Sequence, residues 1–473
     1  MVEGVRRLGR IPGAAIAVVA NGETVFAEGF GVRNLERQLP LDADTLYPIA
    51  STSKSINATL LGMLVDEGKL SWDAPVQAYL PWFRLKDSLA SEQVTLRDLV
   101  VMRTGLPRHD WLWMENPIDR AAIAERLCYL DASAGFRERF QYNNLTVTTS
   151  GYLAEVVTGK SWEALVQERI LTPLGMHRTA FSAASSNPCT LGYHENELRE
   201  LLAGRRVACE VTAPSGGVIH STVEDMARWI LFNLNGGCVD GKQLIQPSTL
   251  REIHSPQIVA GNDASARKPN AAYAIGWTLD TYNGYRRVSH GGYLHDVHSE
   301  VTFFPTENLG IVAFVNFGAP MLALLLCEHT FDLIKGLSPV NTAEARLAEY
   351  EKSIAKTREQ RARAHRELNT TPSHPIDHYV GNYGHPAYGT IEISAEGGQL
   401  VLVRDGLTLP LEHWHYDTWV AAENDLFAIH SPHAFDRSSR ILFETDLDGR
   451  ISALSLALEP AVSRIRFCKT RST

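Results

Sequence analysis

A charged segment with few apolar residues divides this sequence into two unequal parts. From residue 342 to 367 the chain reads TAEARLAEYEKSIAKTREQRARAHRE, which predicts a solvated helix that links two domains or, as the alternative, offers a surface to a partner. With 473 residues, the chain can bury a large core and is long enough for two domains. We place the first domain at residues 1–340, the helical linker at 341–374 and the second domain at 375–473.

Strand-like and helix-like segments are mixed in the first part, which predicts an α/β (α+β) domain. The segment AAIAVVA is followed by an Asn21-Gly22 turn, so we expect a first strand there rather than a cleaved leader. The apolar run 309–327 is interrupted near its middle by an asparagine, a glycine and a proline. This favours a buried strand at 311–315 followed by a core helix over a membrane span. We therefore expect a cytoplasmic protein without membrane contact.

In the second part, short segments alternate apolar and polar residues, as strands with one buried face do. These segments are GTIEIS, QLVLVR, DLFAIH and RILFETDLDGRISALSLALE. The last of them contains an Asp448-Gly449 pair, which is typical of a hairpin turn. The sequence therefore predicts a small all-β domain in the C-terminal hundred residues or so.

Composition and residue spacing exclude several classes of function. The formal net charge is −9 and no basic stripe is present, which argues against a nucleic-acid partner. The six cysteines are scattered, without the paired spacing of a zinc site or a disulfide framework, so we expect reduced, mostly buried thiols. The sequence has neither a Walker loop nor a dinucleotide-binding glycine motif, and no cofactor is predicted.

The stretch YPIASTSKS precedes a pattern typical of a helix, and it places Lys54 one turn after Ser51. A positive charge is disfavoured at the start of a helix, where the backbone dipole is itself positive. This environment favours the uncharged amine, which can take the proton of the serine hydroxyl as a general base. Ser51 is therefore a candidate nucleophile, and the helix is expected to end at Gly68.

Two observations keep alternatives open for this pair. Serine is also a common helix N-cap, since its hydroxyl satisfies the free amides of a first turn. The S-x-x-K spacing is moreover short and recurs at Ser265 and Ser353. Spacing alone therefore identifies no nucleophile.

Two further motifs follow S-x-x-K along the chain. The letters YNN at 142–144 form a Y-x-N motif ahead of another apolar helical stretch, and HGG at 290–292 lies between strand-like segments. The ordered trio S-x-x-K, Y-x-N and H-x-G resembles the serine β-lactamase and penicillin-binding protein superfamily, and more closely its class C-like esterases and D-aminopeptidases. Segments such as VTLRDLVVMRTGLPRHD and NLGIVAFVNFG also read as that family.

This resemblance covers nearly all of residues 5–335. It implies a β-lactamase/transpeptidase-like fold, in which an antiparallel sheet is flanked by helices and accompanied by a helical subdomain. The tail, from YVGNYGHPAYGTIEI onward, resembles a small lipocalin-like β-barrel that some members carry. In such a barrel Trp414, Tyr416 and Trp419 would fill the interior, and the domain would cap the cleft and restrict substrate size.

The resemblance also implies a covalent mechanism. Ser51 would be acylated after Lys54 takes its proton, and Tyr142 would hydrogen-bond to the hydroxyl or leaving group and shuttle a proton. Asn144 would hold Lys54 and the substrate amide in place. The backbone amides of Ser51 and Tyr293 would form the oxyanion hole, where each donor is worth roughly 3 kcal/mol of barrier.

His290 and the residues after it depart from the β-lactamase pattern. Most β-lactamases and transpeptidases have a lysine at the position of His290, where it contacts the substrate carboxylate and supports the tyrosine. Histidine is a weaker fixed charge at neutral pH, which argues against a dedicated β-lactamase. Gly291 and Gly292 would border the substrate, but the extra glycine usual in this turn is missing, so the pocket wall is expected to be bulkier. No glutamate can be assigned as a deacylation base.

Three other residues are candidates for the site. Trp111 and Trp113, in a loop after the RTGLP turn, would either form an aromatic wall for an apolar substrate group or pack in the core. Ser215 in APSGG matches a nucleophile elbow only in part, because alanine replaces the first glycine and a proline directly precedes the serine. A capping box of Ser221 and Glu224 beside it favours a structural role.

These motifs predict a serine hydrolase that forms an acyl-enzyme and cleaves an ester, or a small peptide or amide that can contain a D-residue. One rival transfers the same acyl group to an amine or alcohol, as peptide cyclases and acyltransferases do. A second rival is a non-catalytic binding protein, which has no need for all the motif residues. The histidines and the aspartate of segment 290–298 fit no standard metal site, and the partner we expect is a small-molecule ester or peptide.

Overall fold

The computed structural model describes residues 1–470 apart from positions 115, 117, 183–188, 197–199, 205–208, 262–270, 319–321, 340, 363–364, 406 and 422–439. The predicted strand DLFAIH and the S-x-x-K motif at Ser265 lie outside the described residues.

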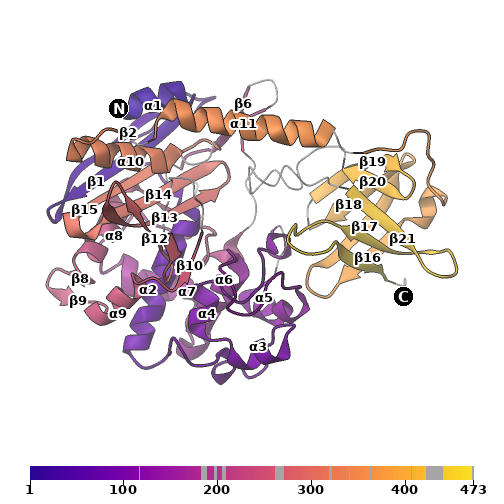
Figure 1. Ribbon diagram of the computed structural model, residues 1–473, viewed down its shortest axis with the longest axis horizontal. Coiled ribbons are helices and arrows are strands. Elements are labelled where there is room, and N and C mark those ends of the chain that lie inside the picture. Colours follow the sequence, from indigo (N-terminus) through magenta and orange to yellow (C-terminus); the bar gives the residue numbers. More distant parts are fainter. Residues whose placement is uncertain are drawn as a thin grey trace.

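A nine-stranded antiparallel sheet forms the centre of the first part of the chain (Figure 1). Its strands are β1 (Gly13–Ala20), β2 (Glu23–Asn34), β3 (Leu39–Pro40), β10 (Ile258–Val259), β11 (Ala272–Tyr273), β12 (Thr278–Tyr282), β13 (Tyr285–Leu294), β14 (Val297–Phe304) and β15 (Leu309–Val315). Their order is β10-β11-β12-β13-β14-β15-β1-β2-β3. The predicted strands at 14–20 and 311–315 are thus β1 and β15, which pair along their whole length. Asn21 and Gly22 both have positive φ and form the predicted tight turn.

Helices cover both faces of this sheet, which explains why β1 is apolar throughout. Ile16 belongs to the core cluster on the side of α1 (Val2–Leu8) and α10 (Leu322–Lys335). Its neighbour Ala17 belongs to the cluster on the side of α8 (Val223–Leu234). Successive side chains of a strand point to opposite faces, so a strand buried on both sides has no polar positions.

A helical subdomain is inserted between β3 and β10. It contains α2 (Ser53–Asp66), α3 (Ser88–Gln93), α4 (Leu96–Val100), α5 (Arg120–Arg126), α6 (Asn144–Thr158), α7 (Trp162–Val166) and α9 (Pro247–Ile253), with the strand pairs β4 (Tyr47–Pro48) and β7 (His220–Ser221), β5 (Tyr193–Glu195) and β6 (Leu201–Ala203), and β8 (Cys238–Val239) and β9 (Lys242–Gln243). Helix α2 is buried at every position from Ser53 to Leu64, rather than along one stripe as an amphipathic helix would be. The chain leaves it through Gly68, which has a φ of 69°.

The predicted charged helix is α11 (Ala343–Ala362), which runs from the sheet toward a second, all-β unit (Figure 1). Its first turn is anchored, since the buried Arg346 lies 3.4 Å from Glu328 of α10. Eight strands then close into a barrel in chain order. They are β16 (Gly381–His385), β17 (Gly389–Glu396), β18 (Gln399–Arg404), β19 (Leu407–His415), β20 (Thr418–Ala421), β21 (Arg440–Thr445), β22 (Ile451–Leu456) and β23 (Ile465–Lys469). The exact boundaries 1–340, 341–374 and 375–473 remain our proposal.

Only one of the three predicted interior aromatics of the barrel is inside it. Trp419 is 2% exposed and packs against Tyr379 and Phe443. Trp414 instead lies under Arg366 at the end of β19, and Tyr416 is 58% exposed in the turn that follows. The buried positions of β19 are Leu407, Leu409 and Leu411, so strand alternation already places position 414 on the outward side, and Tyr416 lies beyond the end of the strand.

The predicted capping box of α8 is wrong by one residue. Thr222, not Ser221, is the N-cap, and its hydroxyl accepts a hydrogen bond from the amide of Asp225 at 3.1 Å. Ser221 hydrogen-bonds to Thr179 at 2.8 Å instead. Among the described helices, none combines the length and the apolar character that a membrane crossing requires.

Candidate active site

Ser51 lies in a short 3₁₀ turn, Ala50–Thr52, that leads directly into α2. Ala50 has a φ of 48°, a left-handed conformation that is costly for residues other than glycine and concentrates at functional sites. The side chain of Ser51 does not cap the helix, because the N-cap position is Thr52 and no side chain caps there. The N-cap alternative for Ser51 is therefore wrong, and the residue is partly exposed at the surface of the site.

Lys54 points its amine at Ser51 from a buried position. The residue is 1% exposed, and its Nζ lies 3.2 Å from Ser51 Oγ and 2.7 Å from Asn144 Oδ1. The Nζ also donates to the backbone carbonyl of Ser215. Burial, and then the repulsion of Arg108, lower the pKa of Lys54 well below its ordinary value, against the attraction of Asp110.

When the amine of Lys54 is uncharged, its contacts determine where its lone pair points. A neutral amine has two N–H groups and one lone pair, whereas a carbonyl oxygen can only accept hydrogen bonds. The oxygens of Asn144 and Ser215 therefore take the two N–H groups. The lone pair is left for the hydroxyl of Ser51, so the geometry fits proton transfer from the serine to the lysine.

Asn144 is the first residue of α6, and the preceding Asn143 caps that helix by accepting from the amide of Thr146 at 2.9 Å. The Nδ2 of Asn144 donates to Asp110 Oδ1 at 3.0 Å, which orients Oδ1 of the amide toward Lys54. Although burial opposes it, the charge of Arg108 together with hydrogen bonds lowers the pKa of Asp110. Asp110 was missed by sequence reasoning, because only the fold brings its loop to the start of α6.

Tyr142 packs against the side chains of both Lys54 and Arg108. The Nζ of Lys54 is 4.5 Å from the centre of its ring, and the guanidinium carbon of Arg108 is 5.0 Å from it. Burial raises the pKa of Tyr142 to about 12, while a hydrogen bond with Ser51 and the charge of Arg108 act in the opposite direction. The phenol is therefore protonated at neutral pH and can both accept a proton from its neighbour and pass one on.

His290 is enclosed beside a second tyrosine. It is 5% exposed, its Nδ1 lies 2.8 Å from the carbonyl oxygen of Gly291, and its Nε2 lies 3.1 Å from the hydroxyl of Tyr273. Since the carbonyl can only accept, Nδ1 carries a proton, and Nε2 is the ring nitrogen that pairs with the phenol hydroxyl. Tyr273 is 2% exposed and shares a core cluster with Tyr142. Among the described residues, the side-chain hydrogen bond of His290 is thus made with Tyr273. No sequence motif indicated this tyrosine.

The two glycines after His290 bring β13 close to the nucleophile. A Cβ on Gly292 would lie 2.3 Å from the carbonyl oxygen of Ile49 and 2.9 Å from the backbone nitrogen of Ser51, so no side chain fits there. Beyond Ser289, β13 pairs with β14 but no longer with β12. After Ser289, the edge of β13 that no longer pairs with β12 therefore faces the 3₁₀ turn. The backbone groups of Gly291 and Tyr293 belong to this part of the strand.

Trp111 and Trp113 are buried, with exposed fractions of 3% and 6%. Trp113 donates from Nε1 to Asp110 Oδ1 at 2.9 Å, and Trp111 packs against Phe467 of the barrel. Of the two alternatives for this pair, an aromatic wall for a substrate group or packing in the core, the burial and these contacts favour packing.

The barrel holds the loop 108–113 through several buried contacts. The amide of His109, a residue with a φ of 48°, donates to Glu459 Oε2 at 2.9 Å. The His109 ring lies 2.6 Å from the hydroxyl of Tyr388. The guanidinium of Arg404 lies 3.8 Å from the ring centre of Trp111. The second domain is thus joined to the segment that carries Asp110.

The other candidates do not form a second site. The Ser215 side chain is fully buried and bonds to Thr148 and Thr212, each within 3.1 Å, so the residue contributes its carbonyl and not its hydroxyl. Asp296 is engaged by His194 at 2.9 Å and by Tyr293 at 2.7 Å. Within the described residues, no group of three or more His, Cys, Asp or Glu side chains could hold a metal ion.

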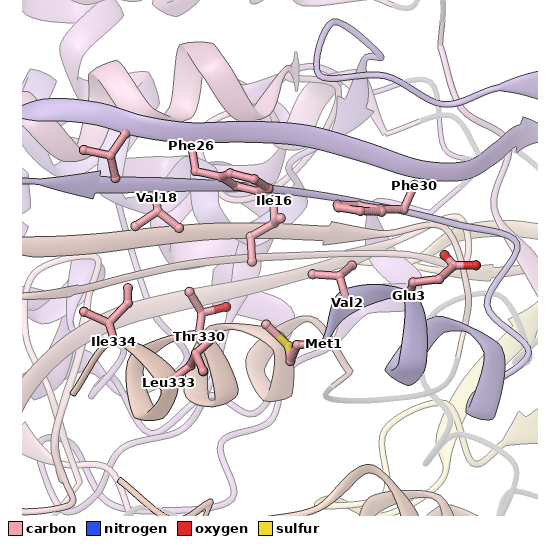
Figure 2. A pocket seen from close by; sticks show the side chains of 11 residues that line it. Met1, Val2, Glu3, Ile16, Val18, Phe26, Phe30, Thr330, Leu333 and Ile334 are labelled. Carbon is pink, nitrogen blue, oxygen red and sulfur yellow. The ribbon is translucent and has the colours of Figure 1, made fainter. Parts of the chain in front are cut away.

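A groove of about 420 Å³ lies on the far side of the sheet from this site (Figure 2). Its walls come from α1, α10, β1 and β2, and they are mostly apolar, with Ile16, Phe26 and Phe30 among them. The lining contains no serine, cysteine, histidine or lysine. Its one carboxylate, Glu3, is ion-paired with Arg6 and Arg7, so we place no catalysis in this groove.

Comparison with known families gives two separate matches along the chain. The family model described as Beta-lactamase matches residues 2–324. A second model, Domain of unknown function (DUF3471), matches residues 365–469, which contain the barrel.

Relatives and solved structures of similar architecture are known. The chain is 27% identical to the unguisins hydrolase ungD' of Aspergillus campestris over 81% of its own length and 74% of that protein. It is 27% identical to protein flp of Staphylococcus aureus over 72% of its length and 67% of that protein. The structure of the octameric penicillin-binding protein homologue from Pyrococcus abyssi matches with a TM-score of 0.64 at 21% identity, covering 99% and 98% of the two chains. The crystal structure of SurE matches with a TM-score of 0.58 at 17% identity, covering 99% and 97%.

Proposed function

The chain belongs to the β-lactamase family, and on that premise we propose that it is a serine hydrolase that forms an acyl-enzyme on Ser51. The observation that carries the proposal is the environment of Lys54. Its two N–H groups are taken by fixed carbonyl oxygens, and its lone pair faces the hydroxyl of Ser51 at 3.2 Å. A lysine with a lowered pKa and this orientation is suited to be a general base.

Acylation follows from this arrangement. Lys54 takes the proton of Ser51 as Oγ attacks the substrate carbonyl, and a C–O bond forms to give a tetrahedral intermediate. The leaving group then departs with a proton that Tyr142 passes on from the lysine ammonium. The hydrogen bond between Tyr142 and Ser51 supports this route, since the phenol lies beside the oxygen that reacts.

The backbone amides of Ser51 and Tyr293 are proposed to bind the oxyanion. The space beside the Ser51 nitrogen is kept open by Gly292, and each such donor is worth roughly 3 kcal/mol of barrier. Water then attacks the ester carbonyl, the Ser51 oxygen recovers its proton, and the acid is released. The acceptor is proposed to be water because relatives in Aspergillus are named unguisins hydrolases.

Intact mass measurement tests the nucleophile. Wild type, Ser51→Ala and Ser215→Ala are incubated with a simple activated ester, a D-alanyl peptide ester and a β-lactam. We expect an acyl adduct on wild type and on Ser215→Ala, which keeps the carbonyl that Lys54 needs, and none on Ser51→Ala. An adduct on Ser51→Ala, or no adduct on any protein, would overturn the proposal. The β-lactam is expected to react least, because His290 is buried and already engaged.

Product analysis separates hydrolysis from acyl transfer. The donor that labels wild type fastest is supplied with and without an added amine or alcohol acceptor. We expect free acid as the main product in both cases. A transfer product that dominates at low acceptor concentration would assign the enzyme to the acyltransferases.

A further inference from the structure

The turn between β13 and β14 has a backbone conformation that its residues rarely adopt. Leu294 pairs with Val297, so His295 and Asp296 form a two-residue hairpin turn. Their φ angles are 53° and 58°, a left-handed conformation for which such turns favour asparagine and glycine. A costly conformation persists only where the surrounding contacts fix it, and such positions concentrate at functional sites.

The carboxylate of Asp296 ties this turn to two other side chains. Its Oδ1 accepts a hydrogen bond from the hydroxyl of Tyr293 at 2.7 Å, and its Oδ2 lies 2.9 Å from Nδ1 of His194 in β5. Although burial opposes it, these two bonds lower the pKa of Asp296, whereas burial and the charge of Asp296 raise the pKa of Tyr293. The phenol therefore donates to a charged carboxylate, which is a strong kind of hydrogen bond.

Three glycines from distant parts of the chain leave room for the turn. A Cβ on Gly318 would lie 2.8 Å from Oδ1 of Asp296, and a Cβ on Gly204 would lie closer still to Oδ2. A Cβ on Gly192 would overlap the carbonyl oxygen of His295. The carboxylate is thus closely packed, and 17% of the Asp296 side chain is exposed.

Tyr293, the residue that Asp296 holds, belongs to the proposed site. Its backbone amide is the second proposed donor to the oxyanion, and it directly follows Gly292, which lies against the backbone of Ser51. The ring of Tyr293 also packs on the ring of His298 in β14, with the two centres 4.5 Å apart. Because the side chain and the amide share one Cα, fixing the ring and the hydroxyl restricts rotation of the peptide group. An oxyanion donor is effective when its direction is fixed in advance.

We propose that Asp296 is a positioning residue for the reaction and that it holds Tyr293 so that the backbone amide of this tyrosine points at the developing oxyanion. This inference rests on the proposed function and deepens it. Asp296 does not touch the substrate in this role. Since His194 holds the second carboxylate oxygen, the two-stranded sheet of β5 and β6 supports the oxyanion hole from outside the nine-stranded sheet.

A matched pair of substrates reports on the oxyanion hole. An activated ester and its thionoester have the same acyl and leaving groups and differ only in the reacting C=O or C=S group. Sulfur accepts hydrogen bonds more weakly than oxygen and lies farther from carbon, so a well-placed donor accelerates the ester more than the thionoester. The readout is the ratio of the two kcat/KM values, divided by the same ratio for alkaline hydrolysis. General damage from a substitution cancels in this ratio.

The tether predicts a distinct result for each variant. Asp296→Gly removes the carboxylate but suits the left-handed backbone, and the ratio should fall by about 10- to 100-fold, less than the roughly 10²- to 10³-fold effect of losing a donor. Tyr293→Phe keeps the amide and removes the hydroxyl, so it should lower the ratio as much, and the double variant should lower it no further. Asp296→Asn should keep most of the ratio, because its amide oxygen can still accept from Tyr293.

Asp240→Gly is the matched control. Asp240 also has a positive φ, of 46°, and it is exposed in the turn between β8 and β9. The same substitution there relieves the same kind of backbone conformation without touching the tether. The ratio should therefore stay at the wild-type value.

Two kinds of result would overturn the inference. One is a ratio that is close to unity in wild type, or that stays at the wild-type value in Asp296→Gly or Tyr293→Phe. The other is a loss in Asp296→Asn as large as in Asp296→Gly, which would assign the effect to the charge and not to the tether. In these cases intact mass still shows acylation of Ser51, and the proposed function stands. If no ester acylates Ser51 in wild type, the proposed function itself fails, and the role of Asp296 fails with it.

Discussion

Replacement of Glu459 by glutamine tests whether the barrel helps to position the proposed catalytic residues. Glu459 is 5% exposed, and its two oxygens each accept a backbone N–H, that of His109 at 2.9 Å and that of Ala461 at 3.1 Å. Glutamine has the same shape but only one oxygen. In either orientation its NH₂ group therefore faces a backbone N–H group, and one buried donor is left without an acceptor.

The expected magnitude follows from this conflict. A buried polar group left unsatisfied costs about 1–3 kcal/mol, which is a factor of about 5 to 150 in an equilibrium. If the loop 108–113 moves to relieve the conflict, Asp110 no longer fixes the amide of Asn144 and the lone pair of Lys54 loses its orientation. We therefore expect the acylation rate of Ser51 to fall by about that factor, with a smaller change in KM for a small neutral ester.

The assay is pre-steady-state acylation by an activated ester, with thermal unfolding measured on the same samples. Glu412→Gln is the matched control, since Glu412 lies on the exposed face of β19 and the same substitution there should change neither quantity. The reasoning would be refuted by a Glu459→Gln variant that unfolds at a lower temperature but acylates at the wild-type rate. In that case the buried conflict is real and the loop does not transmit it to the site.

Three further outcomes are expected at the site itself. Lys54→Met should slow acylation of Ser51 by at least about a hundredfold with an unchanged circular dichroism spectrum, and wild-type rates in this variant would exclude the lysine as the base. In wild type, protonation of Lys54 inactivates the base, so the acylation rate should rise with pH through the lowered pKa of this lysine. The rate should level off well below pH 10.5, the ordinary pKa of a lysine. A rate that still rises near pH 10 would contradict this. Gly292→Ala should slow acylation strongly, because its methyl group would lie 2.9 Å from the Ser51 nitrogen, whereas Gly4→Ala, whose methyl group meets nothing within 4 Å, should behave as wild type in the same ester assay.

Local patterns in the sequence were sufficient for much of the architecture. The apolar runs that became β1 and β15, the charged helix α11 and the Asp448-Gly449 turn are determined by neighbouring residues, because strand period, helix composition and turn geometry act over a few positions. The same holds for the spacing of Ser51 and Lys54, which one helical turn brings together. Trp414 and Tyr416 were misplaced because aromatic character alone does not say which face of a strand a residue occupies, and the inward positions of β19 are Leu407, Leu409 and Leu411.

The tertiary structure decided which groups complete the site. The carbonyl of Ser215 takes one N–H of Lys54 across 161 positions of sequence, and a backbone carbonyl carries no signature in the amino-acid letters. Asp110 orients Asn144 from a loop that barrel residues hold in place, and Tyr273 reaches His290 only through the pairing of β11, β12 and β13. The sequence by itself indicated the proposed nucleophile and base, since the S-x-x-K spacing sets Ser51, in the 3₁₀ turn, one turn before Lys54 at the start of α2. The surroundings that set their protonation and orientation come from distant segments, because burial and hydrogen bonding exist only once those segments are packed together.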